Sequence, residues 1–434
     1  MIQRLRHLAS LTLVRNILAL YGVRLTNQLL PLVLIPYLAR VLGPTGWGLV
    51  AFAQAFAMYG IIAVEYGFEL AGTREVARER DNPERLGQLI TGVIATQAMI
   101  ALVVALVAFA VQTLIPAFQD EPLLLLAGLA FAVIQGMHPL WYFTGRERLP
   151  LIAAVDTSGK ILATLVIFVL VEAPGDGWIV LACHAAAAAL TLVVGYALVL
   201  REVRPGRLSL ALVRSTLRLG FSMFLMRMAV LMHTAGNAFL LGLLVPPQFV
   251  AFFAAGEKLC RPAAWLLQPV NVALLPRLSS LLGTRPDEAD RLAGLAIALM
   301  GATGLAFGGA LWFAAPWLVR LVYGDGYEAA IPVMQVMAMI VPLIVLNAAL
   351  VSQWMVPRGL DRALNVVIIG ATAINLGLAL LIVPRYQAFG MAWITILVEG
   401  LILLGLLIAL RRRGLRPLDP ALLRRRFARS PSRP

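Results

Sequence analysis

Charged and amide side chains recur at helical spacing inside long apolar stretches of this sequence. Between Tyr21 and Pro44, Arg24 and Gln28 lie one helical turn apart and share a face with Pro31. A guanidinium binds phosphate or carboxylate oxygens through a planar set of N–H donors, and an amide adds a further donor and acceptor. These residues could therefore hold an anion within an apolar segment.

Three other stretches carry comparable polar stripes. The first holds Gln54, Glu65 and Glu69 on one face, the second Arg227 and Asn237 on a broader arc, and the third Glu257, Arg261 and Gln268 on one face. Intramembrane charges are costly and mostly face a bundle interior or a water-filled cavity. The pattern predicts that the four helices carrying these stripes face one another across a central polar cavity.

Each stripe also has a plainer interpretation. Glu65 and Glu69 lie near one end of their span and could extend to the lipid headgroups. Arg24 and Arg227 could be structural partners of a glutamate instead of ligand-binding groups. Glu399, isolated in the last span, is either a proton site or a hydrogen-bonded packing residue. Asp156 and Lys160, four residues apart, could simply neutralise each other.

Composition identifies the elements that must position these side chains. The 434 residues are 61% hydrophobic and 13% charged, whereas soluble domains are nearer half apolar and a quarter charged. Apolar runs of about 20 residues recur along the chain, as expected of membrane-spanning helices. The predicted spans, about twelve, are 16–37, 47–70, 89–115, 123–143, 149–171, 178–200, 219–245, 249–275, 292–322, 331–356, 360–383 and 388–410. The predicted fold class is an all-α integral membrane protein.

The basic residues predict how the chain is oriented. Lys and Arg accumulate in one alternating set of connections and in the tail that begins at Arg411, whereas "PAFQDEP", "EAPGDG", "VPPQ" and "YGDGYE" contain none. Because cytoplasmic loops retain basic residues, both termini are expected in the cytoplasm. The net charge of +14 follows largely from this bias, and the tail could bind anionic lipid headgroups.

The two halves of the chain resemble each other. Arg24 and Arg227 are 203 positions apart, as are Pro44 and Pro247, whereas Trp141 and Trp354 are 213 apart. Small insertions would produce such a growing offset. The repeat predicts a six-helix bundle over 1–206, a second over 207–412 and a basic cytoplasmic tail over 413–434, in the manner of transporters built from parallel repeats. Part of the joining segment 204–218 is expected to form an amphipathic surface helix.

Several chemistries have no support in the sequence. We find no phosphate-binding loop, no zinc-ligand spacing and no polar loop large enough for a catalytic domain, so no catalytic residue, metal site or cofactor is expected and the chain is not expected to be an enzyme. The two cysteines offer no disulfide framework. Nucleic-acid binding is disfavoured because the basic residues are spread over separate loops.

Several longer motifs resemble a known family. They are "LLPLVLIPYLARVLGPTGWGLVAFAQAF" from Leu29, "EYGFELAGTREVARERDNPERLGQLI" from Glu65, "HPLWYFTGRERLPLIAAVDTSGK" from His138 and "LVYGDGYEAAIPVMQVMAMIVPL" from Leu321. Together they are similar to the Wzx-type polysaccharide repeat-unit flippases, whose superfamily also holds the MATE drug exporters and the MurJ lipid II flippases. The resemblance extends over nearly the whole chain and is looser in the second half.

The resemblance implies two six-helix bundles of the MATE-like fold around a cationic lumen, in the bacterial inner membrane, working by alternating access. It implies transport of undecaprenyl-pyrophosphate-linked oligosaccharide repeat units to the outer leaflet for O-antigen, capsule or exopolysaccharide assembly. The lipid bilayer, a polysaccharide polymerase and chain-length proteins would be partners. The substrate-binding candidates are Arg24, Gln28, Gln54, Arg227, Asn237, Glu257, Lys258 and Arg261. Proton or sodium coupling could involve Glu65, Glu69 and Glu399.

Two related functions remain as alternatives. A MATE-type cation or drug antiporter is expected to have a net acidic lumen, whereas this sequence places arginines at repeat-related positions. A lipid II flippase is the second alternative, and that branch commonly carries two further C-terminal spans.

Overall fold

The computed structural model describes the backbone of residues 2–234 and 236–417, and the side chains of residues 30–115, 118–232 and 236–417. The described residues form helices joined by short turns, with no strand among them. By packing, the chain forms two compact units, one of residues 1–251 with 322–326 and one of residues 252–321 with 327–434.

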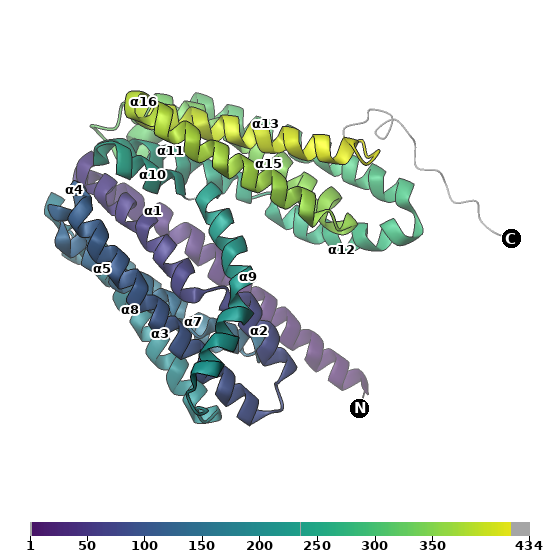
Figure 1. The fold of residues 1–434 in the computed structure, drawn as a ribbon. Helices are drawn as coiled ribbons and strands as arrows, with labels where there is room; N and C mark the ends of the chain where they lie inside the picture. Colours follow the sequence, from purple (N-terminus) through teal and green to yellow (C-terminus); the bar gives the residue numbers. More distant parts are fainter. Residues whose placement is uncertain (1, 235, 418–434) are drawn as a thin grey trace. The chain divides into compact units, whose positions relative to one another are not determined.

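The first helix, α1 (Ile2–Glu65), holds the first predicted span and most of the second. It is interrupted at Gly43, whose φ of 66° and ψ of 178° are non-helical, and the chain turns back there (Figure 1). A glycine adopts such a positive φ without the steric penalty of a Cβ. The "RVLGP" motif therefore marks the turn of a helical hairpin.

The remaining helices of the first unit follow the predicted spans closely. Proline occupies one of the first two positions of five of them, α3, α4, α5, α7 and η1, where its missing N–H has no intrahelical acceptor in any case. The elements are α2 (Phe68–Arg78), α3 (Pro83–Leu114), α4 (Pro116–Gln119), α5 (Pro122–Gly136), α6 (Leu140–Gly145), α7 (Leu149–Leu170), η1 (Pro174–Asp176), α8 (Gly177–Glu202), α9 (Leu210–Thr234) and α10 (Gly236–Leu244).

The packing of the first unit centres on α8, which lies against α5 and α7, while α5 also packs on α1. At the end of the unit that holds the basic connections, Phe68, Trp141 and Tyr142 belong to a buried apolar cluster. Polar groups close this end. Arg148 donates to Glu202 at 2.7 Å and the Tyr142 hydroxyl donates to the same carboxylate at 3.1 Å.

The second unit is built from α11 (Pro247–Trp265), α12 (Gln268–Thr284), α13 (Pro286–Tyr323), α14 (Ala330–Ala338), α15 (Ile340–Leu350), η2 (Val351–Met355), η3 (Val356–Arg358) and α16 (Asp361–Arg411). The first residues of α11, up to Ala251, pack with the first unit. α16 holds the last two predicted spans and turns back at Gln387, which has a φ of 49° (Figure 1).

Small residues let the helices of the second unit approach closely. A methyl group added to Gly304 of α13 would lie 3.0 Å from the Cα of Pro342, and one added to Gly308 would lie 2.8 Å from the carbonyl oxygen of Ala338. Such spacing of small residues drives helix association in lipid. Further along, η2 is a π-helical turn in which three consecutive side chains, Gln353, Trp354 and Met355, are all buried.

The structure fits the predicted spans. Among the described residues, nine helical segments are long and apolar enough to cross a membrane. Two of them, 30–78 and 361–411, each contain parts of two predicted spans. The predicted span 249–275 is divided between α11 and α12 and is not among the nine. The count of about twelve stays a prediction with which this arrangement agrees.

The boundary between the two compact units differs from the boundary between the two halves of the sequence repeat. The repeat places the boundary at 206, whereas residues 207–251, with α9 and α10, pack into the first unit. The connection before α9 also binds to the first unit, because the Gly206 N–H donates to the Gly87 carbonyl of α3 at 3.1 Å and to the Thr91 hydroxyl of α3 at 2.9 Å. Within the segment in which an amphipathic surface helix is expected, residues 210–218 are helical and form the first turns of α9. The repeat-based division into 1–206, 207–412 and 413–434 stays a prediction.

We expect replacement of Trp141 by alanine to destabilise the first unit. The indole is 2% exposed within the apolar cluster, and Trp→Ala substitutions in cores cost about 3–5 kcal/mol. Thermal unfolding of the purified protein in detergent should show a lower midpoint for Trp141→Ala. The control is Leu162→Ala, whose side chain is 58% exposed. Equal midpoints for the two variants would contradict this packing.

Candidate functional site: an ion triad at a helix break

The second membrane span is broken where its glutamates lie. α1 ends at Glu65, and Tyr66 and Gly67 both adopt positive φ, of 51° and 76°, before α2 begins at Phe68. A positive φ is uncommon for a non-glycine residue, and strained backbone is found disproportionately at functional sites. The break changes the direction in which the following side chains project.

α9 packs directly on this break. A methyl group added to Gly67 would lie 2.8 Å from the backbone nitrogen of Phe224 and 3.0 Å from the carbonyl oxygen of Gly220. The rings of Tyr66 and Phe224 stack, with centroids 5.0 Å apart and planes inclined by 17°. Gly67 and Gly220 are therefore glycines for two reasons, close helix approach and, at Gly67, backbone conformation.

Arg227 of α9 joins the two sides of the break. Its guanidinium nitrogen Nη1 donates to the Glu65 carboxylate, at the end of α1, and to the Glu69 carboxylate, in the first turn of α2. Two carboxylates share one guanidinium, so the ionised group carries one formal negative charge. We call Glu65, Glu69 and Arg227 the ion triad.

The side chains of the ion triad are partly exposed. The exposed fractions of the side chains are 16% for Glu65, 28% for Arg227 and 58% for Glu69. The same contact supports the alternative interpretation of Arg227 as the partner of a glutamate, because its Nη1 already donates to both carboxylates. It also unites residues expected in two roles, an anion-binding arginine and ion-coupling glutamates.

The second unit holds an ion pair on its own polar stripe. Arg261 Nε donates to Glu257 Oε1 at 2.8 Å within α11, and both side chains are largely buried. Lys258 follows in the same helix and has an interaction partner as well. The one-turn spacing of Glu257 and Arg261 in the sequence leads directly to this contact.

Glu399 has the hydrogen-bonded partner that one of its two interpretations requires. Asn347 of α15 donates through Nδ2 to Glu399 Oε2 at 2.8 Å and to the Glu399 backbone carbonyl at 3.1 Å, in the interior of the second unit. The sequence does not single out Asn347, because the two residues lie on different helices 52 positions apart.

The other candidates are placed as follows. Gln54 lies half-buried in α1 and Asn237 lies buried at the start of α10, both in the first unit, and each has an interaction partner. The side chains of Arg24 and Gln28 lie outside the described residues. The Asp156–Lys160 ion pair is confirmed, with 2.7 Å between the Asp156 carboxylate and the Lys160 ammonium.

We expect loss of Arg227 to destabilise the junction of α9 with α1 and α2. Breaking a buried ion pair costs about 3–5 kcal/mol, because the remaining charge is left without a partner, and the exposure of Glu69 should keep Arg227→Gln below that range. The triple variant Glu65→Gln, Glu69→Gln, Arg227→Gln should recover part of the loss, since it leaves no uncompensated charge. Thermal unfolding in detergent measures both.

The matched control is Arg285→Gln, which removes an arginine paired with Glu288 at 3.2 Å and 68% exposed. We expect it to leave the midpoint unchanged. If Arg227→Gln behaves like this control, the ion triad does not stabilise the junction.

Comparison with known proteins identifies the family. Residues 13–282 match the family described as "Polysaccharide biosynthesis protein". A candidate O-antigen transporter of Escherichia coli (strain K12) is 26% identical over 395 residues, which cover 91% of this chain and 95% of the relative. Another, from Shigella dysenteriae, is 26% identical over 417 residues, which cover 92% of this chain and 100% of the relative.

Solved structures establish the fold class. The chain is similar to a lipid II flippase MurJ in an inward closed conformation, with a TM-score of 0.72 and 12% identity over 92% of this chain and 87% of that one. It is also similar to an inward-facing multidrug resistance MATE family transporter, with a TM-score of 0.64 and 15% identity over 89% and 98% of the two chains. The expected all-α membrane fold is confirmed. Because the family match extends over more than half of the sequence, this chain belongs to the polysaccharide biosynthesis protein family.

Proposed function

We propose that this protein moves oligosaccharide repeat units, linked to undecaprenyl pyrophosphate, from the cytoplasmic to the outer leaflet of the bacterial inner membrane by alternating access. The observation that carries the proposal is the similarity to candidate O-antigen transporters along nearly the whole length of both chains. A polysaccharide polymerase and chain-length proteins would take up the delivered unit.

The substrate needs such a carrier because its headgroup cannot cross hydrocarbon unaided. Pyrophosphate and sugar hydroxyls would lose their water, and an unpaired polar group is expensive to bury. Arginine suits the pyrophosphate because its planar guanidinium donates two parallel hydrogen bonds to phosphate oxygens. We assign this role to Arg24 and Arg227, with Arg261 and Lys258 as further cationic groups, while the prenyl chain stays in lipid.

The ion triad supports a mechanism in which the substrate pyrophosphate and the carboxylates of Glu65 and Glu69 compete for Arg227. In the structure Glu65 and Glu69 accept hydrogen bonds from Nη1 of Arg227, as a substrate phosphate would. An arriving pyrophosphate would compete with these carboxylates for the guanidinium. The displaced carboxylates would then be without their shared cation, and a proton or sodium ion would compensate them. Substrate binding and ion uptake would thus be linked at one arginine.

The assignment of Arg227 can be tested by transport in reconstituted vesicles containing a fluorescent lipid-linked oligosaccharide. Arg227→Gln and Arg24→Glu should each lower the flipping rate at least tenfold, because a lost charge-assisted hydrogen bond to phosphate is worth about 1.5–3 kcal/mol. Arg285→Gln should keep the rate of the unmodified protein. Normal flipping by Arg24→Glu and Arg227→Gln would remove both residues from the substrate site. Efflux of cationic drugs without lipid transport would favour the antiporter alternative.

The driving force can be separated from the binding site in the same vesicles. An anionic headgroup that leaves a negative interior gains about 2.3 kcal/mol per charge per 100 mV. We expect an imposed potential to drive transport by the unmodified protein and by the variant Glu65→Gln, Glu69→Gln alike. A proton or sodium gradient should drive only the unmodified protein. An equal response of both proteins to the gradient would exclude coupling through these carboxylates, and Glu399→Gln would be examined next.

A further inference from the structure

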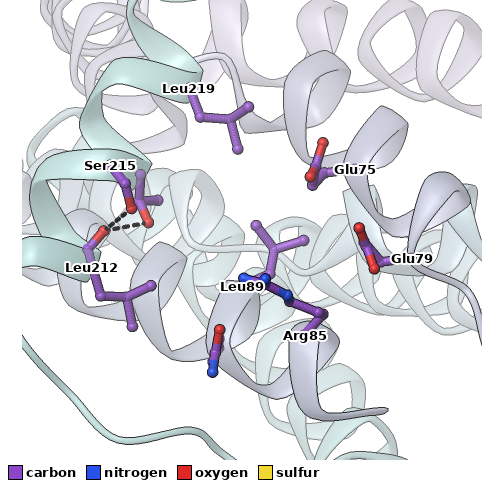
Figure 2. Close-up of a pocket in the computed structure, with 9 residues that line it drawn as sticks. Glu75, Glu79, Arg85, Leu89, Leu212, Ser215 and Leu219 are labelled. Carbon is purple, nitrogen blue, oxygen red and sulfur yellow. Dashed lines mark hydrogen bonds between the residues drawn. The ribbon is translucent and has the colours of Figure 1, made fainter. Parts of the chain in front are cut away.

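A second polar site lies in the first unit, apart from the ion triad. A pocket of about 300 Å³ opens between α2, α3 and α9 (Figure 2). It is lined by Glu75, Glu79, Arg85, Gln88, Leu89, Leu212, Ser215, Thr216 and Leu219. Its volume is at the lower limit for ligand pockets, so it suits a small headgroup better than an oligosaccharide.

The pocket is rich in hydrogen-bond acceptors. Glu75 and Glu79 approach it from α2, and Ser215 and Thr216 face it from α9 (Figure 2). Both hydroxyls already donate to the Leu212 carbonyl, at 2.8 Å and 2.9 Å, so their oxygens remain as acceptors. Two carboxylates and two hydroxyl oxygens are suited to a cationic group with several N–H donors, such as a primary ammonium.

One cation in the lining points to a ligand of mixed charge. Arg85 contributes a guanidinium from the first turns of α3. Its backbone N–H caps the helix by donating to Asn82 Oδ1 at 3.1 Å, and its side chain shares the pocket lining with the two carboxylates. Arg78 lies 3.8 Å from Glu75 and is 67% exposed, so it compensates that carboxylate only weakly. A guanidinium beside two carboxylates can bind a phosphate while they bind an amine.

The position of the pocket favours a membrane lipid as the source of that ligand. The lining residues belong to the last turns of candidate span 30–78 and the first turns of 83–114 and 210–232, except Glu79, which directly follows the first of these spans. Headgroups are found at this depth of a bilayer. Leu89, Leu212 and Leu219 supply apolar surface in the pocket itself, and Leu210, at the start of α9, is 86% exposed.

We propose that this pocket binds the headgroup of an aminophospholipid, with the ammonium on Glu75 and Glu79, the phosphate at Arg85 and the glycerol against the leucines. By the distribution of basic residues this lipid belongs to the cytoplasmic leaflet. Because α9 forms one wall and α2 and α3 the others, the bound lipid would fasten α9 to the first unit. The proposal does not depend on which substrate the protein transports.

Native mass spectrometry of the purified full-length protein, with added phosphatidylethanolamine, phosphatidylcholine or phosphatidylglycerol, tests the proposal. We expect phosphatidylethanolamine to bind at least tenfold more tightly than either of the others, because phosphatidylcholine has no N–H donor and phosphatidylglycerol has no amine. Its addition should also raise the thermal midpoint. Equal binding of the three lipids, or no binding, would overturn the proposal.

Variants separate this pocket from other lipid contacts. Glu75→Gln with Glu79→Gln should weaken phosphatidylethanolamine binding at least tenfold and remove its preference over phosphatidylglycerol. Arg85→Gln should weaken both lipids. Glu84→Gln, one residue before Arg85 and outside the lining, is the matched control and should bind like the unmodified protein. Unchanged binding in the double variant, with its melting midpoint preserved, would show that the lipid binds elsewhere.

Discussion

A charge inside a bilayer must find a partner, and for Arg227 that requirement is met by two carboxylates that share its guanidinium. Glu65 and Glu69 lie on opposite sides of a break in the second span, and Arg227 donates to both. The contact connects α9 to the end of α1 and the start of α2. It also leaves one formal negative charge, which makes the same three residues candidates for both anion binding and ion coupling.

The contact between α2 and α9, which we call the seam, extends this connection along both helices. The two helices run in opposite directions, because Gly67 approaches Gly220 and Phe224 while Glu75 and Glu79 lie nearer to Leu212 and Ser215. The ion triad lies at one end of the seam and the acceptor-rich pocket at the other. Together with the linker bond from Gly206 to Gly87, the seam explains why α9 packs with the first unit although the sequence repeat assigns it to the second half.

Helical periodicity was sufficient to predict which polar side chains share a face, but not which of them meet. Contacts within one helix followed from spacing, as with Glu257 and Arg261 or Asp156 and Lys160. Contacts between helices did not, because Arg227 is 162 positions from Glu65 and Asn347 is 52 positions from Glu399. The helix break at Tyr66 could not be predicted from the sequence either. Tyrosine has no preference for positive φ, and its stacking on Phe224 of α9 comes from a residue far away in the sequence. The hairpin turn at Gly43, in contrast, is marked by its glycine and proline.

The π-helical turn at Val351–Met355 shows how a membrane span can contain an extra residue. Such a turn contains one residue more than an α-helical turn, so a single codon could have been inserted within a span without breaking the helix. The offset between the two halves grows from 203 at Arg24 and Arg227 to 213 at Trp141 and Trp354, and Trp354 lies inside this turn. Under the predicted repeat, one of the residues by which the offset grows would thus be accommodated within a membrane span and not in a loop.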